Sequence, residues 1–162
     1  MKKKELSPEA IEVAAEWWTR VLTAPVKHDN GDPGGFGGVM ADMASEKLAP
    51  PTNEQLRIFK ETLMTLIREE SEKVNVVIVA TDYDPCPLLS KAGAEAGIES
   101  LLFRFPWKTV LWIDYRDVRV RCGYRGKTET IWEMPSFKVI DPDRKSETLD
   151  TKEKADDLSK PE

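Results

Sequence analysis

Three stretches in the first half of the chain place apolar side chains at helical spacing, and strand-like patterns begin only after them. These stretches are residues 8–24, 40–48 and 52–72. Ser7 is placed as the N-cap of the first helix, and Thr52-Asn53-Glu54-Gln55 has the pattern of a capping box for the third. A run of helices followed by a run of strands is typical of α+β domains, so this order predicts that class.

Strand patterns dominate from residue 74 onward. Residues 74–81 are a β-branched run without polar alternation, which predicts a strand covered on both faces. Residues 109–114 and 118–122 predict a hairpin, and residues 128–132 predict a further antiparallel strand. Alternation divides the second hairpin strand into an apolar face of Val118, Val120 and Cys122 and an opposite face of Arg119 and Arg121. Cys122 is therefore expected in the core.

One short helix and one brief strand complete the expected fold. Residues 88–96 are alanine-rich, and Gly97 is placed to end that helix in a left-handed conformation. Residues 101–105 predict the brief strand. We therefore expect an α+β fold in which three N-terminal helices pack on a small, mostly antiparallel sheet of about four strands, with one helix inserted after the first strand.

Charge separates the body of the chain from its end. The chain has 162 residues, which suits one domain, and a net charge of -5. Residues 141–162 hold 8 acidic and 5 basic residues, which leaves 21 acidic and 19 basic residues in the rest. We expect a single domain over residues 1–140 and a charged, disordered tail over residues 141–162. A nearly neutral body argues against direct nucleic-acid binding, which needs a basic face.

The number of cysteines and the hydropathy of the chain predict where in the cell the protein is located. The chain has two cysteines, no apolar leader follows Met1, and no stretch approaches the length of a membrane span. We expect a cytoplasmic protein that does not enter a membrane. A lone histidine does not make a typical zinc site, so neither a metal nor another cofactor is expected.

The segment of residues 26–38 is the least regular part of the chain. Its five glycines and Pro33 predict a loop, and Asn30-Gly31 predicts a turn within it. Its backbone amides could bind an anion, but a phosphate-binding loop follows a strand and ends in a cation, and this segment does neither. A partner-contact loop is the favoured interpretation. Its candidate binding residues are Asp29, Asn30, Asp32, Gly35 and Phe36.

The chemically reactive side chains are few and scattered. His28 is the only histidine and is expected to be a solvated loop residue, although Asp29 or Asp32 could orient it as a base. Cys86 stands at a helix start, where a thiol can become reactive. Asp82 and Asp84 follow a strand, where they form a turn in one interpretation and a phosphotransfer or metal site in another. A ligand-binding or hydrolase site would form only if the residue 26–38 loop folds beside these groups.

Aromatic and basic side chains supply the remaining candidates for binding. Five tryptophans is a high number for this length, and the adjacent Trp17 and Trp18 must point about 100° apart on a helix. Core packing explains most tryptophans, but an exposed Trp17 would be an interface anchor. Arg119 and Arg121 form a solvated strand face in the default interpretation, and they could instead bind an acidic partner or a nucleotide.

Four short segments carry a resemblance. They are Ala14-Ala15-Glu16-Trp17-Trp18, His28-Asp29-Asn30-Gly31-Asp32, Pro51-Thr52-Asn53-Glu54-Gln55-Leu56 and Phe105-Pro106-Trp107-Lys108-Thr109-Val110. Together they resemble small, uncharacterised proteins of Firmicutes and of their phages and mobile elements, over about the first three quarters of the chain. The resemblance implies no catalytic residue. It implies an accessory or anti-defence role exerted by binding a host protein.

These observations lead to one hypothesis and one alternative. The hypothesis is a non-enzymatic binding protein, an inhibitor of a bacterial defence nuclease such as a CRISPR effector. The alternative is a small-ligand or nucleotide-binding protein, or a hydrolase, with a site around His28, Cys86 and Asp82.

Overall fold

The computed structural model describes residues 3–24, 28 and 35–135. Several sequence predictions lie outside these residues. They are the turn at Asn30-Gly31, the candidate binding residues Asp29, Asn30 and Asp32, and the charged tail of residues 141–162.

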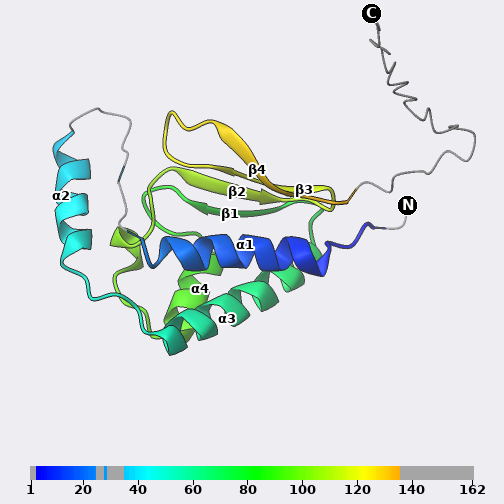
Figure 1. The fold of residues 1–162 in the computed structure, drawn as a ribbon, viewed down its shortest axis with the longest axis horizontal. Helices are drawn as coiled ribbons and strands as arrows, with labels where there is room; N and C mark the ends of the chain where they lie inside the picture. Colours follow the sequence, from blue (N-terminus) through cyan, green and yellow to red (C-terminus); the bar gives the residue numbers. More distant parts are fainter. Residues whose placement is uncertain (1–2, 25–27, 29–34, 136–162) are drawn as a thin grey trace, which may run out of the picture.

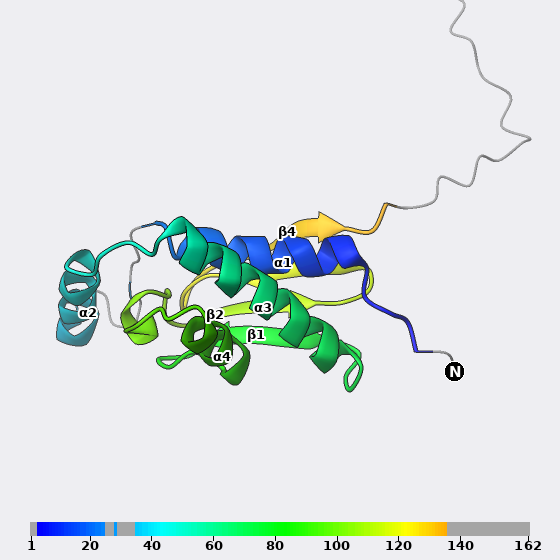
Figure 2. The same cartoon turned by 90° about the horizontal axis from the view of Figure 1, so that it is seen from below.

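The fold has two layers, a four-stranded antiparallel sheet and three helices on one of its faces (Figures 1 and 2). The strands are β1 (Val77–Thr81), β2 (Thr109–Ile113), β3 (Asp117–Arg121) and β4 (Thr128–Glu133), and they pair in that order. The covering helices are α1 (Pro8–Val21), α3 (Asn53–Ser71) and α4 (Pro87–Glu95). The predicted α+β class and the inserted helix, which is α4, are confirmed.

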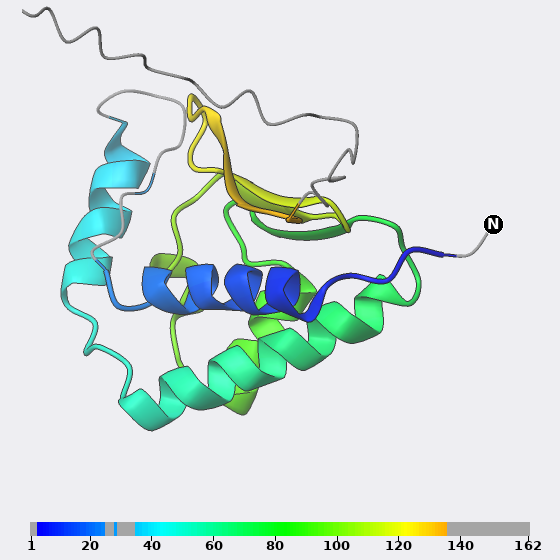
Figure 3. The same cartoon turned by 45° about the vertical axis from the view of Figure 1, so that its right-hand side comes forward.

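Helix α2 (Phe36–Glu46) stands at one end of the molecule, apart from the two layers (Figures 1 and 3). Its main contact with the other elements is the short 3-10 helix η1 (Leu101–Phe103). This position leaves most of its circumference away from the core.

Local sequence signals begin and end the helices as predicted. The Ser7 hydroxyl accepts a hydrogen bond from the Glu9 amide at the start of α1. At the start of α3, the Thr52 hydroxyl accepts from the Gln55 amide, and the Gln55 side chain accepts from the Thr52 amide. Gly97 follows α4 with φ +66°, the left-handed conformation that glycine adopts without strain.

The core lies between the sheet and the three helices. Alternate strand residues point into it, and they include Val79, Leu111 and Val118. The Trp18 ring meets the Phe105 ring edge-on at 5.3 Å, and Phe59 of α3 lies 6.1 Å from the same Phe105 ring. This aromatic group joins α1, α3 and the segment before β2.

Four local predictions are wrong, each for a physical reason. Residues 74–81 are not covered on both faces, because β1 is an edge strand with helices on one side only, and Ile78 is 53% exposed. Residues 101–105 contain η1 rather than a strand, and η1 follows Ser100 in a left-handed conformation. Cys122 is exposed, because β3 ends one residue before it.

The fourth error concerns the glycines. The helix α2 begins at Phe36, so Gly37 and Gly38 belong to it and not to the loop. Gly38 is buried. Among the described residues, no helix combines the length and the apolar composition that crossing a membrane requires.

The capping box of α3 provides a test of the fold. Replacing Thr52 with alanine removes the acceptor for the Gln55 amide, and we expect a loss of about 1 kcal/mol in the free energy of unfolding, measured by denaturant titration. The control is Thr65→Ala, which changes an exposed threonine inside the same helix. Because alanine has the higher helix propensity, this control should keep or slightly raise stability. Equal losses in both variants would contradict the assignment of the cap.

Candidate functional site

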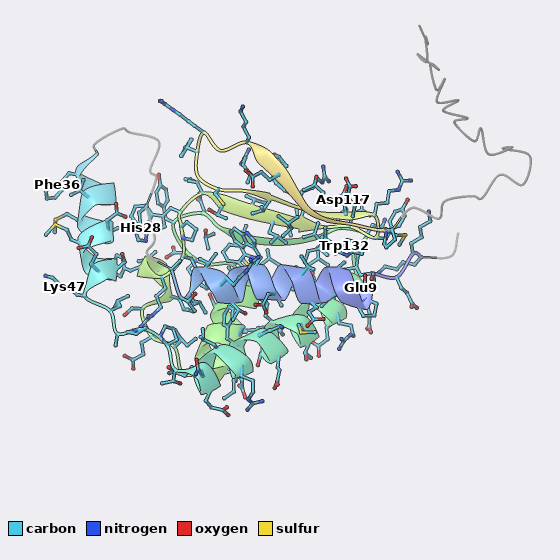
Figure 4. All side chains as sticks on the ribbon, in the orientation of Figure 1. Glu9, His28, Phe36, Lys47, Asp117 and Trp132 are labelled. Atoms are coloured by element: carbon cyan, nitrogen blue, oxygen red, sulfur yellow. The ribbon has the colours of Figure 1, made fainter. Side chains whose placement is uncertain are left out.

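Helix α2 carries a continuous apolar stripe on its solvent side. Phe36 is 79% exposed, Val39 49%, Met40 48% and Met43 49%. Their spacing of three, four and seven residues places all four on one face of the helix. Figure 4 shows Phe36 on the side of α2 that faces away from the body. Such a stripe normally packs against another surface, and here it faces solvent.

The opposite face of α2 is small and polar, and it is fastened to the body through His28. Gly38 and Ala41 are buried on this face. The Asp42 carboxylate oxygen Oδ1 accepts two hydrogen bonds, from the His28 backbone amide at 2.7 Å and from His28 Nδ1 at 2.8 Å. Figure 4 places His28 between α2 and the rest of the fold.

His28 is buried, so the expectation of a solvated loop residue is wrong. Only 5% of it is exposed, and its ring stands edge-on to Trp107 at 4.8 Å and to Phe103 at 6.4 Å. The cause is a partner 14 residues away, since Asp42 satisfies both donors that burial would otherwise leave unpaired. The carboxylate that orients the ring is therefore Asp42, whereas Asp29 and Asp32 lie outside the described residues.

The Asp42–His28 pair is oriented like the carboxylate–histidine pair of a general base. Among the described residues, no nucleophile is hydrogen-bonded to the histidine. An ionised carboxylate only accepts hydrogen bonds, so Nδ1 donates, and in the neutral ring Nε2 carries the lone pair. Nε2 is buried and has no hydrogen-bond partner among the described atoms. The Cys86 thiol is therefore not hydrogen-bonded to it, and the pairing that a cysteine hydrolase needs is not formed.

Asp82, Asp84 and Cys86 have structural partners of their own. The Asp82 carboxylate bonds to the Lys108 ammonium, and this hydrogen bond raises the pKa of Lys108. The Asp84 carbonyl accepts from the Asp82 amide in the turn after β1. Cys86 is the N-cap residue of α4, and its own amide donates to the Ala80 carbonyl. Within the described part of the chain, no three histidine, cysteine or acidic residues gather as a metal site would require.

A pocket of about 450 Å³ lies beside Asp42, between the end of α1, α2 and η1. Its polar wall includes Asp42, Glu46 and Arg104, and Leu22, Leu48 and Phe103 are among its apolar residues. Arg104 donates to the carbonyls of Glu99 and Ala49, and its partial burial lowers the pKa of its guanidinium. The volume falls in the range of small-molecule sites.

The remaining predicted binding residues lie in three places. Gly35 is the N-cap residue of α2 and adjoins Phe36. Trp17 is half-buried on α1 with its ring 4.9 Å from Trp18, so it belongs largely to the core rather than to an exposed anchor. Arg119 and Arg121 lie on β3, on the sheet face opposite the helices. The predicted binding residues that the structure describes therefore do not lie together in one site.

Sequence reasoning missed Asp42 and the exposure of the Met40 and Met43 side chains. The spacing of the methionines indicated a helix, but it did not show which side of that helix faces the body. A signal was available, because Gly38, Ala41, Asp42 and Ser45 form a small and polar face opposite the apolar stripe.

Comparison with known proteins identifies no family. No protein-family model matches the sequence, and no curated protein matches it.

The His28–Asp42 contact predicts a local change in stability. Asp42→Ala leaves two donors of buried His28 without their acceptor, which costs about 2 kcal/mol. Because α2 depends on this contact, we expect faster amide hydrogen exchange in α2 than in the wild type, while α3 keeps its protection. The control is Glu46→Ala on the same helix, which should leave both patterns unchanged. Unaltered exchange in α2 of the Asp42 variant would refute the anchoring role.

Proposed function

We propose that this protein acts by binding another protein, and that α2 is the element that docks. The observation that supports this most is the exposed stripe of Phe36, Val39, Met40 and Met43. The partner would supply an apolar groove, because an amphipathic helix that binds through such a stripe lays it into a groove.

The side chains of the stripe suit this role. Burial of a large apolar side chain contributes about 1.5–3 kcal/mol, and three of these four begin about half exposed, so the gain from each of those is smaller. Phe36 is the most exposed of the four side chains, so its burial would contribute most to binding, and we expect it to be the hot spot. Methionine is flexible and adapts to grooves of irregular shape.

The attachment of α2 to the body favours binding as well. The two hydrogen bonds from His28 to Asp42 hold the helix before any partner arrives. Ordering a segment on binding costs free energy, so a helix that is already formed and held retains more of its contact energy.

The resemblance to proteins of Firmicutes and their phages indicates which partner to test first. We propose a host defence protein, such as the nuclease of a CRISPR effector, and we propose that occupation of its groove inhibits it. The resemblance supports this partner class, and the stripe supports the mode of contact.

Affinity capture tests the docking role of α2. The wild-type chain should retain a partner in stoichiometric amount from a lysate of a bacterium that carries the defence system, and Phe36→Glu and Met40→Glu should each lose it. The matched control is Val74→Glu, which puts the same charge on an exposed apolar residue between α3 and β1. Capture of no stoichiometric partner, or equal capture by the stripe variants, would count against the proposal.

A second candidate function rests on the pocket between α1, α2 and η1. Its volume of about 450 Å³ and its lining by the acidic Asp42 and Glu46 and the basic Arg104 suit a small polar ligand. Thermal-shift measurements with a panel of nucleotides test it, since a ligand that binds the folded state raises the melting temperature. We expect Arg104→Leu to abolish any rise. A panel that produces no shift removes nucleotides as candidates.

A further inference from the structure

The face of the sheet opposite the helices is a second unshielded surface, separate from α2. Helices α1, α3 and α4 lie on one face, and none of the described helices covers the other (Figures 1 and 2). Strand register places the side chains of this face in two rows. One row is Ile78, Trp112, Arg119 and Thr130, and the other is Ala80, Val110, Arg121 and Thr128.

This open sheet face is divided into an apolar half and a cationic half. The apolar half lies on β1 and β2, where Ile78 is 53% exposed and Trp112 is half-buried. The cationic half lies on β3, where the Arg119 guanidinium pairs with Asp117 at 3.0 Å. Arg121 stacks over Trp112 at 5.9 Å, and it has no carboxylate partner among the described residues. Within the described part of the chain, no carboxylate therefore competes with an external anion for Arg121.

We propose that this face binds an acidic amphipathic helix of a partner protein. The apolar stripe of that helix would cover Ile78 and Trp112, and its flanking carboxylates would meet Arg121. An amphipathic helix suits this face because its apolar stripe would cover the exposed apolar half while its polar flank meets the arginine side. Arginine is suited to the charged side, since its planar fork binds carboxylates in bidentate fashion.

A single-stranded nucleic acid suits this face less well. Bases bind by stacking on aromatic rings, but Ile78 and Val110 have none, and Arg121 already lies over the Trp112 ring. The division into an apolar half and a cationic half therefore favours the acidic helix.

Peptide binding to the full chain tests this proposal. The probe is a fluorescently labelled, synthetic amphipathic helix with a leucine stripe flanked by glutamates, and its partner probe has lysines in place of the glutamates. The acidic peptide should bind and the lysine peptide should not, as read by fluorescence anisotropy. Arg121→Glu and Ile78→Glu should each weaken the acidic peptide about tenfold. Added salt should weaken it further, because the charged contacts are near the surface.

Controls separate this surface from α2 and from the helical layer. Arg68→Glu makes the same charge change on an exposed position of α3 and should stay within about twofold of wild type. Phe36→Glu should also leave the peptide affinity unchanged, so loss of the α2 interaction and loss of this one are distinguishable. The proposal is overturned if the acidic peptide does not bind, if both peptides bind equally, if Arg121→Glu has no effect, or if an oligothymidylate binds this face in place of the peptide.

Discussion

The burial of one face of the sheet under α1, α3 and α4 is the constraint on which the rest of the structure depends. Trp18, Phe59 and Phe105 join the helical layer to the segment before β2, and alternate strand residues fill the space beneath them. Because these helices all lie on the same side, the fold stops at two layers. The open sheet face and the outer side of α2 are exposed because this core does not cover them.

Among the described residues, the α2 stripe and the open sheet face both present apolar side chains outside that core, and they differ in how they are held. The open sheet face belongs to strands whose other face forms the floor of the core. The stripe on α2 is carried by a peripheral helix, which is fastened through η1 and through the two hydrogen bonds between His28 and Asp42. A buried imidazole between Phe103 and Trp107 thus serves to orient an exposed helix.

The sequence predicts those parts of the fold whose signals are local. Capping by Ser7 and Thr52, the left-handed Gly97 and the alternation of the hairpin depend on neighbouring residues, and the structure confirms them. The exposure of Ile78 could not be predicted, since a β-branched run looks alike in a central strand and in an edge strand covered on one face. Burial of His28 depends on Asp42, which no local pattern connects to it. Of the four residues in the α2 stripe, only Phe36 was among the binding residues expected from the sequence.

The distribution of reactive groups favours recognition over catalysis as the proposed mode of action. A general base needs a nucleophile or a substrate proton within reach of its free nitrogen, but Nε2 of His28 is closed off and unpartnered within the described structure. Asp82 is engaged with Lys108, and Cys86 begins α4. Within the described residues, His28, Asp42 and Asp82 therefore hold elements of the fold in place. An apolar stripe outside a core gains free energy when another surface covers it, and for this reason we propose α2 as the binding element.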